Sequence, residues 1–376
     1  MKALRSILGV SIALAVPAVA AAKPARIAEN SYGLPWQLPD QRGFSAQERE
    51  AHRQLEARVR GIGEGFNGDI GIAVQDVASG WSTAFDGNSF FPQQSVSKFW
   101  VALAALDRAD RGALDLGERV TIGRDDLTLF HQPVARLIGA GGYSAPISDF
   151  LFRAITQSDN TCNDTVLRVA GGPDAVRAYL RGRAISGIRF GPGERLLQSA
   201  IAGIEWRQSY SVGNGFYAAR SAVPASARRA AFESYISDPM DGATPLGIVD
   251  ALARLKRGEL LSAASTARLL SIMGQTKTGA LRLKGGLVPG WTLSHKTGTG
   301  QVLGGEQAGY NDIGIVTSPD GRSYAVAVMI RRTSAPLGER MAAMQNAVRA
   351  VIAYHGLRSD VGMAGRYSAG TTNGTR

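Results

Sequence analysis

The sequence predicts a two-lobed fold, α/β plus all-α, with one antiparallel sheet flanked by helices and a helical lobe inserted into it. Apolar runs typical of strands occur near both ends of the chain, and the apolar residues between them recur mostly at helical spacing. A helix-like segment precedes the first strands and another follows the last. This order indicates that the two ends of the chain build one sheet lobe together.

The first 22 residues have the three-part organisation of a secretory signal peptide. Lys2 and Arg5 precede an apolar run, and three alanines end it. The run is shorter than the roughly 20 residues that a membrane span needs, and Pro17 interrupts it. We therefore expect a secreted, periplasmic protein without a stable membrane anchor.

The rest of the chain divides by composition and apolar pattern. We expect an extended arm at 23–44, a folded domain at 45–357 made of a sheet lobe (45–92 and 256–357) and a helical lobe (93–255), and a disordered tail at 358–376. Ser45 is a suitable N-cap for a helix that continues to about residue 58. Residues 69–77 and 81–85 flank a Ser-Gly turn and predict a β-hairpin.

Further elements follow the same reasoning. Residues 95–109 place apolar side chains on one helical face. Residues 312–317 and 324–330 flank a Pro-Asp-Gly turn and are predicted as paired strands. The closing helix is predicted over 339–355, ended by Gly356.

Charge and cysteine usage exclude several functions. The formal net charge is +11, which becomes 11 − 2 = +9 without Lys2 and Arg5. No helix-turn-helix, zinc-finger spacing or aromatic-basic strand accompanies this charge, so we expect no nucleic-acid partner. No histidine cluster has metal spacing, and we expect no cofactor. The single cysteine, Cys162, can form no internal disulfide and is expected to be a small buried residue.

The first chemical motif is Ser95-Val96-Ser97-Lys98. On a helix, residues three apart share a face, so Ser95 and Lys98 are predicted to lie side by side. A serine becomes a nucleophile when a base takes its proton, and an adjacent lysine can help to do that. The helix N-terminus also favours negative charge developing on the serine.

The second motif is Ser158-Asp159-Asn160. The Ser158 hydroxyl can relay a proton to a leaving nitrogen, and the Asn160 amide can orient a substrate amide. We interpret Asp159 as a structural brace.

The third motif, Lys296-Thr297-Gly298-Thr299, follows a strand-like run. Lys296 and Thr297 can hold a substrate carboxylate, and Gly298 is expected to let the substrate approach closely. The Thr299 amide can form an oxyanion hole with the Ser95 amide. A second Lys-Thr-Gly at 277–279 lies in a loop-like stretch and is interpreted as a decoy.

Taken together and in this order, the three motifs resemble those of class A β-lactamases and penicillin-binding proteins over residues 45–356. The resemblance implies a serine β-lactamase-like fold and a β-lactam substrate, opened through an acyl-enzyme on Ser95. We expect a monomer. Acylation would use Lys98, a water held by Glu194, or both as the base, with Ser158 as the proton relay.

The resemblance also implies a glutamate that activates water for deacylation. Counting from Gly171-Gly172-Pro173 places this role on Glu194, with Gln198 where the family has a water-holding asparagine. Glu205, beside Trp206, is the alternative.

The sequence departs from the family pattern around that glutamate. Asp241 matches an aspartate that pairs with an arginine in the family, but Pro192 stands in the place of the arginine. The insertion at 199–240 is longer than usual and either replaces this brace by packing or remodels the rim of the pocket. Asp164 stands where the family has an asparagine; two close carboxylates raise one pKa, and a protonated Glu194 would be a poor base.

Three positions concern substrate binding. Asn311 lies near the place of the family's usual carboxylate-binding arginine, and Arg282 resembles an alternative arginine that some members use. His131 falls where an aromatic side chain lines the pocket, and we interpret it as a wall rather than a catalyst.

Two other functions fit the same motifs. The first is a D-alanyl-D-alanine peptidase that β-lactams acylate and block; Glu194→Ala should trap acyl-enzyme in a β-lactamase and change little in a peptidase. The second is a non-catalytic envelope or β-lactam-sensing protein, in which Ser95 would take no covalent label.

Overall fold

The computed structural model describes residues 43–368, with side chains through residue 358. The predicted signal peptide at 1–22, the arm up to residue 42 and the last part of the tail, 369–376, lie outside the described residues. Within the described part, no helix is both long enough and apolar enough to cross a membrane.

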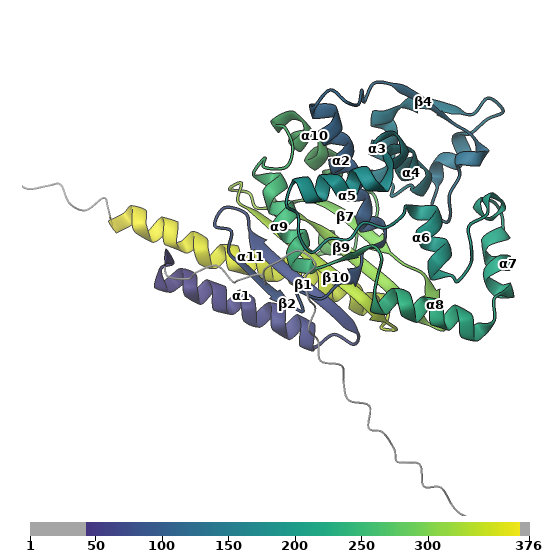
Figure 1. The fold of residues 1–376 in the computed structure, drawn as a ribbon. Helices are drawn as coiled ribbons and strands as arrows, with labels where there is room; N and C mark the ends of the chain where they lie inside the picture. The colour runs from purple at the N-terminus through teal and green to yellow at the C-terminus, as the bar shows by residue number, and fades with distance from the viewer. Residues whose placement is uncertain (1–42, 369–376) are drawn as a thin grey trace, which may run out of the picture.

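One antiparallel sheet connects the two ends of the domain (Figure 1). Its strands follow the order β2-β1-β10-β9-β7, and short β8 pairs with β9. Their bounds are β1 (Asp69–Asp76), β2 (Ser82–Phe85), β7 (Thr292–Thr299), β8 (Val302–Leu303), β9 (Glu306–Thr317) and β10 (Ser323–Thr333). Because β1 pairs with β10, the predicted sheet from both ends of the chain is confirmed.

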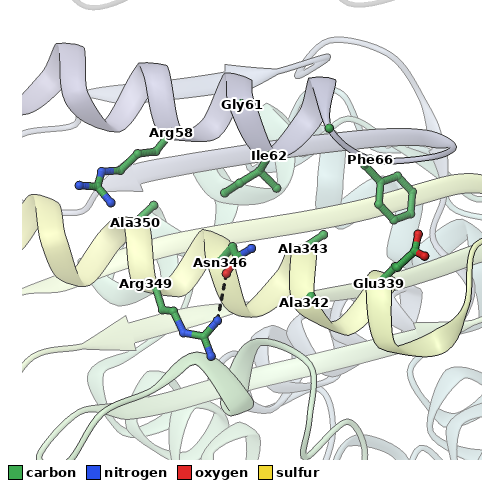
Figure 2. Close-up of a pocket in the computed structure, with 11 residues that line it drawn as sticks. Arg58, Gly61, Ile62, Phe66, Glu339, Ala342, Ala343, Asn346, Arg349 and Ala350 are labelled. Carbon is green, nitrogen blue, oxygen red and sulfur yellow. Dashed lines mark hydrogen bonds between the residues drawn. The ribbon is translucent and has the colours of Figure 1, made fainter.

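Helices α1 (Ala46–Glu64) and α11 (Leu337–Ser368) lie side by side over one face of this sheet (Figure 1). The predicted N-cap is confirmed, since the Ser45 hydroxyl accepts from the Glu48 amide and the Glu48 carboxylate accepts from the Ser45 amide. A cavity of about 650 Å³ opens between the two helices, and at its edge Arg349 donates to Asn346 (2.9 Å; Figure 2).

The predicted end of the last helix at Gly356 is wrong. Helix α11 continues to Ser368, so the part of the tail expected to be disordered up to that residue is helical. Gly356 lacks the positive φ of a helix-ending glycine. Beyond it, Arg358 pairs with Glu48 (3.1 Å) and with Asp76, which ties the helix to α1 and the sheet.

The other face of the sheet carries the helical lobe. The helices on this side of the sheet are α2 (Lys98–Asp110), α3 (Ile147–Thr156), α4 (Asn160–Val169), α5 (Gly172–Gly182), α6 (Glu194–Ile201), α9 (Pro245–Lys256) and α10 (Ala263–Gly274). Two small ladders pair β3 (Phe91–Pro92) with β6 (Gly242–Ala243) and β4 (Arg119–Ile122) with β5 (Tyr143–Pro146). Short 3₁₀ turns are η2 (Gln94–Ser97), η3 (Arg124–Asp126), η4 (Pro133–Leu137) and η6 (Leu283–Gly286).

Helix α2 is the centre of this lobe. Its first ten residues are all buried, including the charged Lys98 and Asp107, whereas the sequence predicted only one apolar face. Cys162 on α4 is also fully buried, as predicted.

The insertion at 199–240 forms η5 (Gln208–Ser211), α7 (Gly215–Ala222) and α8 (Ala225–Ser237). In α8, Phe232 and Tyr235 pack against Leu197 and Ile201 of α6, which joins the insertion to the helix that begins at Glu194. Arg229 also pairs with Glu306 on β9 (2.6 Å), so α8 bridges α6 and the sheet.

Candidate active site

Ser95 lies in the turn η2, immediately before helix α2. It is partly exposed, whereas Gln94 before it and Lys98 after it are buried. Gln94 has a φ of +53°, a conformation that costs a non-glycine residue free energy and is typical of functional sites. The turn therefore presents one reactive hydroxyl to the surface and holds its neighbours inside.

The Lys98 ammonium group connects the first motif to the rest of the site. Its Nζ lies 2.6 Å from Ser95 Oγ, 2.7 Å from Asn160 Oδ1 and 2.6 Å from Glu194 Oε1. A protonated lysine has three N–H donors, so each donor has one acceptor here. The side chain is fully buried and that of Glu194 is only 4% exposed, which makes this a buried ion pair beside the nucleophile.

The second motif lies at the start of α4, as a strained turn. Ser158 has a φ of +58°, and its hydroxyl accepts a hydrogen bond from Lys296 Nζ (2.9 Å). The Asp159 carboxylate accepts from the amides of Val134 (2.7 Å) and Cys162 (2.9 Å), which is the bracing role expected of it. The brace holds Ser158 in a backbone conformation that it would otherwise avoid.

Lys296 lies on β7, buried between the two lobes. Its Nζ donates to Ser158 Oγ and to the carbonyl of Thr297 (2.9 Å each). Burial, and then the charge of Lys98, hold the pKa of Lys296 well below the usual lysine value. Lys296 can therefore give up a proton more readily than an exposed lysine.

The expectation for Gly298 was wrong in its physical reason. A Cβ at this position would lie 2.3 Å from the carbonyl oxygen of Gln93 and 3.2 Å from the side-chain nitrogen of Asn311. The missing side chain thus makes room for the turn before Ser95 and not for a substrate. Asn311 itself donates to the carbonyls of Pro92 (2.7 Å) and Gln93 (3.0 Å), so it fastens this turn to β9.

Arg282 lies beside the third motif. Its guanidinium donates to the carbonyls of Gly298 (2.9 Å) and Asn311 (2.7 Å) and to the Thr299 hydroxyl (2.5 Å), and it stacks on the Tyr310 ring. The Lys-Thr-Gly interpreted as a decoy also reaches the site, because the Thr278 hydroxyl lies 2.7 Å from that of Thr297. Because residues 277–279 lie in a loop, their sequence did not predict this contact.

The structure brings Glu194, and not Glu205, to the nucleophile. Glu194 is the first residue of α6 and contacts Lys98, whereas Glu205 is exposed on the insertion. The Glu194 amide donates to Asp164 Oδ1 (3.2 Å). Burial first, and then the charge of Glu194, raise the pKa of Asp164 to about 6. The charged form of Asp164 is therefore disfavoured beside Glu194.

Asp241 has no cationic partner among the described residues. Its Oδ2 accepts from the Gln94 amide (2.8 Å) and from the Tyr235 hydroxyl (3.2 Å), and its Oδ1 has no hydrogen-bond partner in the described part of the chain. Burial raises its pKa to about 7. The insertion therefore supplies Tyr235 where the sequence lacks an arginine at Pro192.

Replacing Asp241 by asparagine should flatten the pH dependence of stability. A carboxyl whose pKa rises from 3.8 to about 7 keeps its proton in the folded protein over a range where the unfolded chain loses it. The folded state then binds more protons, and the free energy of unfolding falls as pH rises from about 4 to about 7, by up to roughly 4 kcal/mol. In urea unfolding across this range, the free energy of unfolding of the variant should increase relative to that of the parent protein as pH rises.

The matched control is Asp174→Asn, which changes an exposed carboxylate on α5. Its unfolding free energy should stay parallel to that of the parent protein at every pH. If the free energy of unfolding of Asp241→Asn also ran parallel to that of the parent protein, the raised pKa of Asp241 would be contradicted.

The motifs converge on a cavity of about 240 Å³. It is lined by Ser95, Phe130, His131, Ser158, Asn160, Glu194, Gln198, Thr278, Arg282, Thr297 and Thr299. Lys98 and Lys296 lie directly behind this wall, while Gly298 lines no part of it. His131 stands in the wall as expected; its ring nitrogen lies 2.8 Å from the Gln157 carbonyl.

Phe130 and Thr278 are the lining residues that sequence reasoning missed. Phe130 has a φ of +60°, is 39% exposed and contacts Phe216 of α7 edge-to-face, at 4.8 Å between ring centroids. The sequence shows only that the insertion contains aromatic residues. It does not show that one of them, Phe216, contacts a residue of the cavity wall.

Comparison with known proteins agrees with this geometry. The model of the β-lactamase enzyme family matches residues 54–355. The extended-spectrum β-lactamase PER-1 of Pseudomonas aeruginosa is 28% identical over 290 residues, which cover 77% of this chain and 83% of that protein.

Solved structures show the same likeness. A β-lactamase from Chitinophaga pinensis DSM 2588 superposes with a TM-score of 0.63 at 26% identity, covering 82% of this chain and 98% of its own. An ancestral (GNCA) class A β-lactamase has a TM-score of 0.62 at 28% identity, covering 79% and 98%.

Proposed function

Because this chain belongs to the β-lactamase enzyme family and is a class A serine β-lactamase, we propose that it opens the β-lactam amide through an acyl-enzyme on Ser95. The observation that carries the residue roles is the Lys98 ammonium, which joins Ser95, Asn160 and Glu194 within hydrogen-bond distance. Ser95 is exposed to a substrate, and the groups that would move its proton are buried behind it.

In acylation, Glu194 takes a proton from Lys98, and the neutral amine then takes the proton of Ser95. A water held by Glu194 and Gln198 is the other route for that proton. The Ser95 oxygen bonds to the lactam carbonyl carbon, while the Ser95 and Thr299 amides stabilise the developing oxyanion. This leaves a tetrahedral intermediate with the ring nitrogen still attached.

The carbon–nitrogen bond then breaks. The leaving nitrogen takes the Ser158 proton, and Lys296, 2.9 Å from the Ser158 oxygen, can replace it because its pKa is lowered by burial. Asn160 orients the substrate amide. Arg282, Thr297 and Thr299 supply the polar edge for the substrate carboxylate, and Lys296 lies directly behind them.

Deacylation requires a water that attacks the ester carbonyl. Before this step, exchange with solvent removes the proton that Glu194 accepted in acylation and restores the one that Lys296 gave up. Glu194 then takes a proton from the attacking water, with Gln198 beside it. The Ser95 oxygen leaves with a proton from Lys98, and Lys98 recovers that proton from Glu194. The products are the ring-opened acid and the free serine, so the site returns to its starting protonation.

The first test is the hydrolysis of a chromogenic cephalosporin by the mature protein, in burst and in steady state, with mass spectrometry of the same sample. Sustained turnover without a lasting adduct is the expected result. One equivalent of product with a stable adduct on Ser95 would instead indicate a penicillin-binding peptidase, and no adduct at all would indicate a non-catalytic protein.

We also propose that residues 1–22 are removed during export to the periplasm and that the mature enzyme is a monomer. The charge pattern of the first 22 residues supports the export signal. The lobe boundaries at 92–93 and 255–256 remain our proposal for the division of the domain.

A further inference from the structure

We propose that Tyr235, on the inserted helix α8, is a positioning residue for deacylation: its hydroxyl fixes the Gln94 amide, which in turn orients Gln198 beside Glu194. This inference rests on the proposed role of Glu194 as the base that activates water.

The direction of each hydrogen bond follows from the chemistry of the groups. Gln94 Nε2 can only donate, so the Tyr235 oxygen, 2.6 Å away, accepts from it. The Tyr235 proton is then free to donate to Asp241 Oδ2 (3.2 Å). Burial raises the pKa of Tyr235 well above its usual value, so the phenol stays a neutral donor. The side chain of Gln94 is thereby held in one of its two amide orientations.

That orientation is passed on to Glu194. With Nε2 on Tyr235, Gln94 presents Oε1 to Gln198 Nε2 (2.9 Å). The same Gln198 nitrogen lies 3.4 Å from Glu194 Oε2, and Gln198 Oε1 accepts from Gln301 (3.0 Å). If Gln94 turned its amide over, two NH₂ groups would face each other, and Gln198 Nε2 would lose the nearer of its two acceptors.

Water cannot replace these partners without disrupting the packing, since Tyr235, Gln94 and Gln198 are each at most 5% exposed. A buried donor that loses its acceptor bears the full desolvation penalty. The ring of Tyr235 also packs against Leu197 and Ile201 of α6. Tyr235→Phe keeps this packing and removes only the hydroxyl, which separates positioning from support of the helix.

The experiment compares Tyr235→Phe with the parent enzyme on a chromogenic cephalosporin. We expect kcat to fall roughly tenfold or more through slower deacylation, while kcat/KM, which reports acylation, changes much less. Mass spectrometry of the reacting enzyme should show acyl-Ser95 accumulating in the variant. An unchanged acyl-enzyme fraction would overturn the proposal, even if the melting temperature fell.

Tyr179→Phe is the matched control, because it removes another buried phenol, which donates to the Leu260 carbonyl (3.2 Å). It should alter stability without accumulating acyl-enzyme.

Gln94→Met removes the amide that joins Tyr235 to Gln198, and it tests the proposal on its own if Tyr235→Phe does not fold. It should accumulate acyl-enzyme as well, and where Tyr235→Phe folds, the double variant should be no slower than the worse single variant, because both changes break one chain of contacts. Normal deacylation in Gln94→Met, or additive losses, would overturn the inference. A parent enzyme that itself retains a stable adduct would instead contradict the proposed function.

Discussion

Replacing Glu194 by glutamine should stop the enzyme after one acylation. Glutamine keeps the shape of the side chain but cannot take a proton from water, and a general base contributes roughly 10²–10⁴ to a rate. Ser95 should still be acylated, more slowly if Glu194 relays its proton. Mixed with a chromogenic cephalosporin, the variant should release one equivalent of product, and its mass should rise by that of the acyl group and stay raised.

Glu205→Gln is the control for that experiment. Glu205 is exposed on the insertion and outside the cavity, so this variant should turn over like the parent enzyme. The reverse result, in which Glu205→Gln is trapped and Glu194→Gln turns over, would assign the base to Glu205.

Replacing Lys98 by methionine should affect both acylation and folding. Covalent labelling of Ser95 by a β-lactam should slow by roughly 10³-fold or more, because the serine loses the group that takes its proton. The free energy of unfolding should fall by about 3–5 kcal/mol, because Glu194 becomes a buried carboxylate without its cation. Denaturant unfolding and time-resolved mass spectrometry measure the two effects separately.

A second substitution separates charge from packing. The double variant Lys98→Met with Glu194→Gln has no unpaired buried charge, so most of the lost free energy of unfolding should return. The covalent labelling of Ser95 should remain as slow as in Lys98→Met. Lys256→Met, which changes an exposed lysine at the end of α9, should leave both quantities unchanged. A double variant as unstable as Lys98→Met alone would show that the loss comes from packing and not from the buried charge.

The core of the site could be predicted from sequence because its chemistry is local. Ser95 and Lys98 are three residues apart at a helix start, and Ser158 and Asn160 share one turn, so their spacing fixes their geometry. Placing Glu194 needed the resemblance to a family, since no local pattern joins it to Lys98, 96 residues away in the chain.

The remaining features depend on contacts across the chain that leave no local pattern. Gln94 and Tyr235 are 141 residues apart, and a tyrosine inside an insertion looks the same whether it faces solvent or a buried carboxylate. The requirement for glycine at position 298 is set by the carbonyl of Gln93, which reaches it only after the turn before Ser95 packs on β7. The contact between Thr278 and Thr297 is unpredictable for the same reason, because only folding brings the two hydroxyls together.

The adjacency of α1 and α11 has a consequence for rearranging the gene. The Gln47 side chain donates to the Leu357 carbonyl (3.2 Å), and Glu48 pairs with Arg358, so the start of the first helix lies beside the last one. Both helices cover the sheet face opposite the helical lobe that carries Ser95 (Figure 1). Circular permutation, which joins such neighbouring segments and opens the chain at a surface loop elsewhere, is therefore compatible with an intact catalytic centre.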